Sequence, residues 1–167
     1  FVLSVTTALK STRQFASTPV LSPPAPPTVE NIVTLFGRDY DFVTPIAVTA
    51  QVVVVVLVGQ LLFSVLAAYA FARLEFPGRD ALFWVYLGTL MVPQAVTVIP
   101  LYLMMTEVGL RNTFWALVLP YVLGSPFAIF LLREHFRTIP QDLIDAARLD
   151  GAGTVGILRH VVVPVSR

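Results

Sequence analysis

The sequence predicts an all-α protein, a polytopic bundle of membrane-spanning helices. Of its 167 residues, 56% are apolar and 13% are charged, about half the charged fraction of soluble domains. Three windows contain no charged residue, and each has the ~20 residues needed to cross ~30 Å of hydrocarbon. In a soluble protein, three such helices would leave too little amphipathic material to cover them. A membrane location is therefore favoured.

The elements follow in order along the chain. Residues 1–9 are apolar and begin without methionine or a basic region, so we expect the end of a first span in a fragment rather than a signal peptide. Residues 10–45 are rich in proline, which disfavours helix and predicts an ordered external loop, with a free linker as the alternative. A short helix within it is expected from Thr28 to Gly37. The predicted membrane domain, 46–167, has spans at 46–72, 81–105 and 113–132, followed by a loop at 133–167.

Basic residues near the helix ends predict the orientation, because they are enriched in cytoplasmic loops. They are more numerous and denser in segments 73–80 and 133–167, which we therefore expect in the cytoplasm. On that side lie Arg73, Arg79, Arg133, Arg137, Arg148, Arg159 and Arg167, and on the other side lie Lys10, Arg13, Arg38 and Arg111.

The residues of the loop at 133–167 predict two short helices joined at glycine. Thr138 and Gln141 have the spacing of a capping box, and Pro140 suits a first helical turn. Gly151 is placed to end the first helix in the left-handed conformation. Leu143, Ile144 and Ala147 would share one face of that helix.

The second helix of this loop is expected to be capped by Thr154 and ended by Pro164. An ordinary pair of helices on the membrane surface explains these residues as well as a docking element does. A membrane protein that holds such a pair at the water boundary is nevertheless suited to bind a soluble partner there.

Several classes of chemistry are disfavoured. The net charge is +1, which gives no signal for nucleic acid, and there is no cysteine for a disulfide or thiolate metal site. His135 and His160 lie far apart, and we expect no metal site and no catalytic residues. The three spans contain no Asp, Glu, Lys, Arg or His, which argues against a membrane enzyme or an ion-coupled transporter.

Polar residues in the spans are the candidates for a solute pathway. Gln94 and Thr97 stand out, because the proline-flanked segment MVPQAVTVIP (91–100) could open and expose its backbone. Packing between helices is the alternative for both side chains.

The spacing within residues 145–164 resembles the EAA loop of binding-protein-dependent ABC importer permeases. That pattern reads Glu-Ala-Ala, three residues, Gly, nine residues, then Ile-x-Leu-Pro. Every spacing is kept here from Asp145 through Gly151 to Pro164. The replacements are conservative: Asp145 for Glu, Val161 for Ile and Val163 for Leu.

Further segments are similar to the carbohydrate branch of this family, which includes the smaller membrane subunit of the maltose importer. One departure is AVTAQ (47–51), where the family often has an Asn-Ser pair. The similar segments, in family order, are TTALKS (6–11), PPTVEN (26–31), LAAYAFARLEFPGRD (66–80), MVPQAVTVIPLY (91–102), GLRNTF (109–114) and FRTIPQDLIDAARLDGA (136–152).

The resemblance implies a type I ABC importer permease with six spans, of which this chain holds the end of span 1 and spans 2–4. It implies a non-catalytic, multi-pass subunit of a bacterial or archaeal plasma (inner) membrane, with its EAA loop in the cytoplasm. In this family the loop docks on a separate ATPase. The residues implied in this coupling are Leu143, Asp145, Ala146, Ala147, Leu149, Asp150 and Gly151.

The implied partners are a dimer of ATP-binding subunits, a second homologous permease subunit, an extracytoplasmic solute-binding protein and the lipid bilayer. ATP and Mg would be bound by the ATPase partner, because this sequence has no phosphate-binding Gly-x4-Gly-Lys-Ser/Thr loop. The chain itself would need no cofactor.

The expected function is to form half of the pathway for a sugar or sugar-derived solute. A permease of the same superfamily for glycerophosphodiesters, polyols, amino acids or peptides is the main alternative. An ion-coupled secondary transporter fits less well, and a structural interaction module would not need an EAA-spaced loop.

Overall fold

The computed structural model describes residues 1–37 and 42–166, and every regular segment among them is helical. The all-α expectation is therefore confirmed. The chain forms two compact units, Phe1–Gln51 and Val52–Arg167, which are described in turn. Arg38 and Arg167, two of the basic residues used for the orientation, lie outside the described residues.

The first unit holds three short helices, α1 (Val2–Ala8), α2 (Thr12–Ser17) and α3 (Glu30–Phe36). α3 lies within the expected bounds and ends at Gly37. α2 departs from the expected loop, because Ser11 and Gln14 form a capping box at its start. The Ser11 hydroxyl accepts from the Gln14 N–H at 3.4 Å, and the Gln14 side chain accepts from the Ser11 N–H at 3.2 Å.

Lys10 organises the proline-rich segment that follows α2. Its side chain is buried, with 2% exposed, and its ammonium donates to the Pro19 carbonyl and the Ser22 hydroxyl, both at 3.0 Å. The Asn31 amide then donates to the Lys10 carbonyl at 2.7 Å and ties α3 to the same point. These contacts hold the proline-rich segment against the end of α1 and the start of α3.

α4 (Val43–Arg73) contains the predicted span 46–72. It has 31 residues and is apolar enough to cross a membrane. At 1.5 Å per residue it is about 46 Å long, more than the ~30 Å of hydrocarbon. Its buried residues all lie in its C-terminal part and are Ser64, Ala68, Tyr69 and Phe71.

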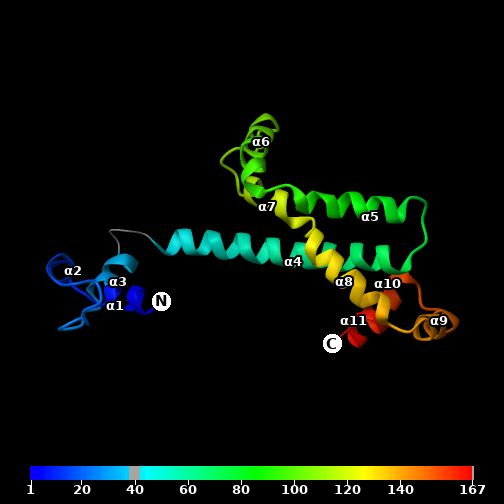
Figure 1. The fold of residues 1–167 in the computed structure, drawn as a ribbon, viewed down its shortest axis with the longest axis horizontal. Coiled ribbons are helices and arrows are strands. Elements are labelled where there is room, and N and C mark those ends of the chain that lie inside the picture. The colour runs from blue at the N-terminus through cyan, green and yellow to red at the C-terminus, as the bar shows by residue number, and fades with distance from the viewer. Residues whose placement is uncertain (38–41, 167) are drawn as a thin grey trace. The chain divides into compact units, whose positions relative to one another are not determined.

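The predicted span 81–105 is not one continuous helix. It consists of α5 (Arg79–Gly88), the 3-10 turn η1 (Thr89–Met91) and α6 (Gln94–Glu107), with a bend of 102° between Arg79–Met91 and Gln94–Glu107 (Figure 1). The break falls at Pro93, which forces Val92 into an extended conformation and cannot donate to the preceding turn. The break falls within residues 91–100, the segment that the sequence predicts could open, so the predicted interruption is confirmed.

The predicted span 113–132 corresponds to α7 (Phe114–Val122) and α8 (Pro126–Thr138), which together form a 25-residue apolar helical segment. Gly124 joins them at a φ of 107°, and the Ser125 N–H donates to the buried Ser64 hydroxyl of α4 at 3.2 Å. α8 continues beyond residue 132, so the first residues of the predicted loop 133–167 belong to this helix.

The C-terminal segment comprises α9 (Gln141–Leu149), α10 (Thr154–Ile157), the π-helical turn η2 (Leu158–Val162) and α11 (Val163–Val165). Two expected boundaries differ. Gly153, not Thr154, is the N-terminal flanking residue of α10, and no side chain caps this end. Pro164 lies inside α11 rather than after it, because the helix widens into the π turn just before this proline.

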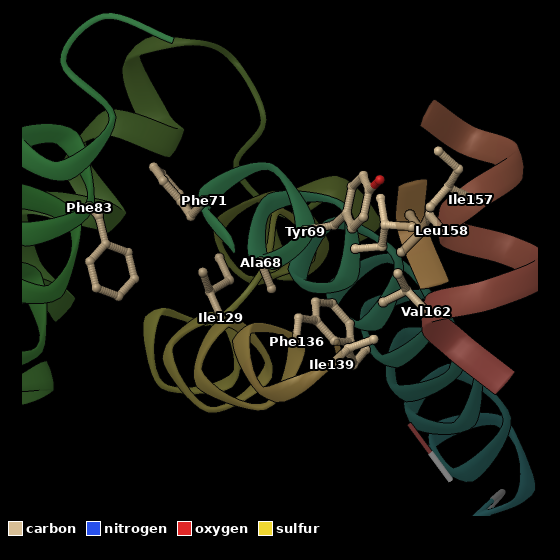
Figure 2. Close-up of a cluster of buried hydrophobic side chains, with 11 residues drawn as sticks. Ala68, Tyr69, Phe71, Phe83, Ile129, Phe136, Ile139, Ile157, Leu158 and Val162 are labelled. Carbon is tan, nitrogen blue, oxygen red and sulfur yellow. The ribbon is translucent and has the colours of Figure 1, made fainter. Parts of the chain in front are cut away.

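A hydrophobic core joins the C-terminal end of α4 to α5, α8 and the C-terminal helices. In Figure 2, Tyr69 of α4 lies beside Leu158, and Phe136 of α8 lies between Ala68 and Val162. Ile144 of α9 completes this core with no exposed surface. One face of α9 therefore packs against the end of the longest helix.

Candidate functional site

α9 carries most of the residues that the sequence singles out for a partner. Ile144 and the half-buried Ala147 face the core, whereas Leu143 is 44% and Leu149 91% exposed. The exposed residues of the predicted set are Leu143, Asp145, Ala146, Leu149, Asp150 and Gly151. The structure thus brings the whole set together on one short helix and its end, with Ala147 alone turned inward.

The beginning of α9 differs from expectation. Thr138 is the last residue of α8 and its hydroxyl donates to the His135 carbonyl at 2.8 Å, so the predicted capping box is absent. Pro140 is the N-terminal flanking residue instead. The cause is Pro140 itself, which confines Ile139 to an extended conformation and prevents a helix from starting at Thr138.

The end of α9 is as expected. Gly151 adopts a φ of 84° and lies just after Asp150. The Ala152 N–H donates to the Ala147 carbonyl at 2.9 Å, and the Gly151 N–H donates to the Arg148 carbonyl at 3.0 Å. These two bonds form a Schellman motif, which satisfies the last carbonyls and turns the chain towards α10.

A short polar chain runs along the exposed side of α9. The Asp145 carboxylate accepts from the Gln141 amide at 3.0 Å and from the Arg148 guanidinium at 3.2 Å. Asp145 and Arg148 are each about half exposed, so their ion pair contributes little stability and remains open to a partner.

Arg73, the last residue of α4, holds the junction between α8 and α9. Its guanidinium donates to the Phe136 carbonyl at 3.1 and 2.6 Å, to the Ile139 carbonyl, and to the Gln141 side-chain oxygen at 2.9 Å. In the sequence, Arg73 is used only as one of the basic residues that predict the cytoplasmic side. Its basic character at a helix end is a weak signal, and its partners lie too far along the chain to be read from a local pattern.

A second arginine joins α8 to α4 and α5. Arg133 lies with its guanidinium carbon 4.0 Å from the Phe83 ring centre and donates to the Phe71 carbonyl at 3.4 Å. It also pairs with Glu134 at 2.6 Å and with Asp80 at 3.7 Å. Its side chain is only 12% exposed, so these contacts are screened less than surface pairs.

The pathway candidates Gln94 and Thr97 lie together in the first turn of α6, directly after the break at Pro93. Both are exposed, and the Thr97 hydroxyl donates to the Gln94 carbonyl at 2.8 Å. The Thr97 hydroxyl thus bonds to its own helix, which leaves the Gln94 amide as the better candidate for solute contact.

Among the residues that the structure describes, no three His, Asp or Glu side chains are grouped so that they could hold a metal ion. His160 lies with its Nδ1 3.1 Å from the Gly156 carbonyl, and the His135 ring neighbours Phe136. The expectation that the chain needs no cofactor stays a prediction.

Residues 60–167 match the protein family described as "Binding-protein-dependent transport system inner membrane component". The matched region includes the second half of α4 and everything after it. It therefore contains the Arg73 junction, the bent pair of helices and α9.

Individual proteins agree with this match. The sn-glycerol-3-phosphate transport system permease protein UgpE of Rhizobium meliloti is 39% identical over 119 residues, which cover 71% of this chain and 42% of that protein. The arabinooligosaccharides transport system permease protein AraQ of Halalkalibacterium halodurans is 32% identical over 142 residues, which cover 85% of this chain and 50% of that protein. The chain thus spans about two fifths to one half of the length of these curated relatives.

A solved structure is also similar. It is a crystal structure of a bacterial ABC transporter involved in the import of the acidic polysaccharide alginate. The TM-score is 0.84 and the sequence identity 25%, over 97% of this chain and 56% of that one. The similarity thus extends to nearly all helices described above.

Proposed function

This chain belongs to the family of binding-protein-dependent transport system inner membrane components, and from that membership we propose that it forms part of the permease of an ATP-driven importer. In this proposal it builds half of a translocation pathway and couples to a separate ATPase through α9. The chain itself is a non-catalytic subunit, and a partner ATPase dimer binds ATP and Mg.

The observation that carries the proposal is the arrangement of α9. One face, through Ile144 and Ala147, is fixed in the core, while Leu143 and Leu149 project outward as apolar anchors. Small Ala146 allows a groove wall to approach closely. A helix that is fixed on one side and open on the other can transmit a push from a soluble partner into the bundle.

The remaining partners follow from the same family. A second homologous permease subunit would supply the other half of the pathway, and an extracytoplasmic binding protein would deliver the solute. The proposal places the loop 133–167 in the cytoplasm of a bacterial or archaeal cell and the segment 10–45 outside. The excess of arginines in and around α8, α9 and α10 supports this orientation.

We propose a sugar or sugar-derived solute. The names of the similar proteins refer to arabinooligosaccharides, alginate and sn-glycerol-3-phosphate, which are all rich in hydroxyl groups. A glycerol phosphate or a glycerophosphodiester is the second candidate, favoured by the higher identity to the glycerol-3-phosphate permease.

The test is a site-specific photo-crosslink in the complete transporter, expressed in membranes with its neighbours. A crosslinking residue at Leu149, which is 91% exposed on α9, is expected to capture an ATP-binding subunit. The same probe at Leu21, which is 82% exposed in the segment 10–45, is the matched control and should not reach that subunit. Capture from Leu21 and not from Leu149 would contradict both the coupling role and the orientation.

Uptake by the same complex identifies the solute class. Vesicles supplied with ATP and the binding protein should accumulate at least one labelled compound from a panel of sugars, polyols and glycerophosphodiesters. Accumulation of an amino acid or a peptide alone would exclude the sugar branch while keeping the importer.

The Gln94→Ala variant tests the pathway. We expect the solute concentration for half-maximal uptake to rise about threefold to tenfold, the effect of one lost hydrogen bond. Thr106→Val is the control, because Thr106 is an exposed polar residue at the far end of α6 whose hydroxyl already donates to the Tyr102 carbonyl of its own helix at 2.9 Å. Unchanged uptake in Gln94→Ala would remove this residue from the pathway.

A further inference from the structure

We propose that Arg73 is a positioning residue that locks α9 to the end of α4, so that a movement imposed on α9 is passed to this membrane helix. The inference rests on the proposed coupling through α9 and adds the element that receives the movement. Arg73 lies within residues 60–167, the segment that matches the family.

The contacts of Arg73 all fall on one joint. α8 ends at Thr138 and α9 begins at Gln141, so only Ile139 and Pro140 separate the two helices. The Arg73 guanidinium reaches both sides of this gap, at the Phe136 and Ile139 carbonyls and at the Gln141 side chain. It therefore ties three helices together at one point.

An arginine suits this joint for a physical reason. The last carbonyls of a helix lack partners within the helix and carry the negative end of its dipole, so a cation there is favourable. The guanidinium is a planar fork with five donors, which lets it serve a backbone carbonyl and an amide oxygen in fixed directions. A lysine would keep the charge but could not hold these directions at once.

The joint continues into the exposed side of α9. Gln141 accepts from Arg73 through its oxygen and donates through its nitrogen to Asp145 at 3.0 Å. Asp145 in turn pairs with Arg148. A partner that displaces Arg148, the exposed end of this series of side chains, therefore acts on the same hydrogen bonds that hold the joint closed.

The apolar core alone does not fix the direction of α9. Ile144 and Ile139 are buried, but apolar contacts tolerate sliding and repacking. Directed hydrogen bonds from a charged group restrict the angle between α9 and α4 more tightly. The core thus attaches α9 to the end of α4, and Arg73 fixes the angle between the two helices.

The experiment measures the distance between two spin labels in the assembled transporter. The labels are placed at Leu62→Cys on the exposed side of α4 and at Asp142→Cys on α9, in a transporter whose other cysteines have been replaced; the 167 residues themselves contain none. We expect one narrow distance distribution in the parent protein and a distribution at least about twice as broad in Arg73→Met and Arg73→Lys. Arg137→Met is the matched control, because Arg137 is 55% exposed and pairs only at the surface of α8.

The second readout is the number of ATP molecules hydrolysed per solute imported. This ratio should rise about tenfold in Arg73→Met and remain unchanged in Arg137→Met. A variant that is merely less abundant would lose ATP hydrolysis and solute import together, which leaves the ratio unchanged. Gln141→Ala should broaden the distribution of label distances in the parent protein. In Arg73→Met it should cause no further broadening, because both side chains act in one joint.

An unchanged distance distribution in Arg73→Met would overturn the inference whatever happens to uptake. A broader distribution with an unchanged ATP-to-solute ratio would overturn the transmission step. A failed crosslink from Leu149 would instead contradict the proposed function, since the distance measurement requires no ATPase contact.

Discussion

Gly151→Val is expected to leave the transporter inserted and assembled but to reduce solute uptake per transporter about 5- to 30-fold. Gly151 has a φ of 84°, a conformation that is unfavourable for side chains with a Cβ by about 1–2 kcal/mol and more so for β-branched ones. One to two kcal/mol changes a conformational population about 5- to 30-fold. Valine would therefore depopulate the turn that ends α9.

The effect is specific to the backbone. A Cβ added at Gly151 meets no heavy atom within 4 Å, so the expected loss comes from the backbone conformation and not from a collision of the Cβ. Gly153 provides the control: its Cβ would also lie in open space, but its φ is −74°. Gly153→Val should therefore keep uptake, and Gly151→Asn should keep most of it, because asparagine tolerates the left-handed region.

The measurement is ATP-driven uptake into vesicles, divided by the amount of assembled complex. Equal loss of uptake in Gly151→Val and Gly153→Val would mean that bulk in this turn, and not its conformation, matters. Normal uptake in Gly151→Val would contradict the coupling role of the α9 turn.

Gly59→Leu is expected to destabilise the helix bundle by about 1–3 kcal/mol, the usual range for added bulk in a packed interior. A Cβ at residue 59 of α4 would lie 2.2 Å from the Val122 Cγ2 atom and 3.2 Å from the Val122 carbonyl oxygen of α7. Small residues allow such close helix approach in membranes, where packing rather than hydrophobicity drives association. α4 and α7 would have to separate.

Thermal unfolding of the detergent-solubilised transporter, followed by its elution profile, measures this loss. Gly88→Leu is the matched control, because a Cβ at this helical glycine meets nothing within 4 Å. The milder Gly59→Ala should be partly rescued by Val122→Ala, which removes the methyl groups that collide. A Gly59→Leu protein as stable as the parent would show that the two helices do not approach this closely.

The sequence predicts the existence of the helices well, because each depends on a local property. The length of the charge-free segments predicts α4 and the pair of helices α7 and α8, and Pro93 predicts the break before α6. Gly151 is likewise a local signal, since few other residues adopt its conformation.

The errors have physical causes. The capping-box spacing of Thr138 and Gln141 is overridden by Pro140, whose ring restricts the preceding residue. The real capping box, at Ser11 and Gln14, has the same local signature and was available in the sequence. The contacts of Arg73 cannot be predicted from the sequence, because they depend on α4 and α9 meeting in space.

Lys10 makes the first unit accessible to a chemical measurement. It is the sole lysine among the 167 residues, and its ammonium is buried beneath the Pro19 and Ser22 region. An amine-reactive reagent can modify it only after this loop opens. The rate at which a lysine-directed label is incorporated at this position therefore reports the opening free energy of the loop.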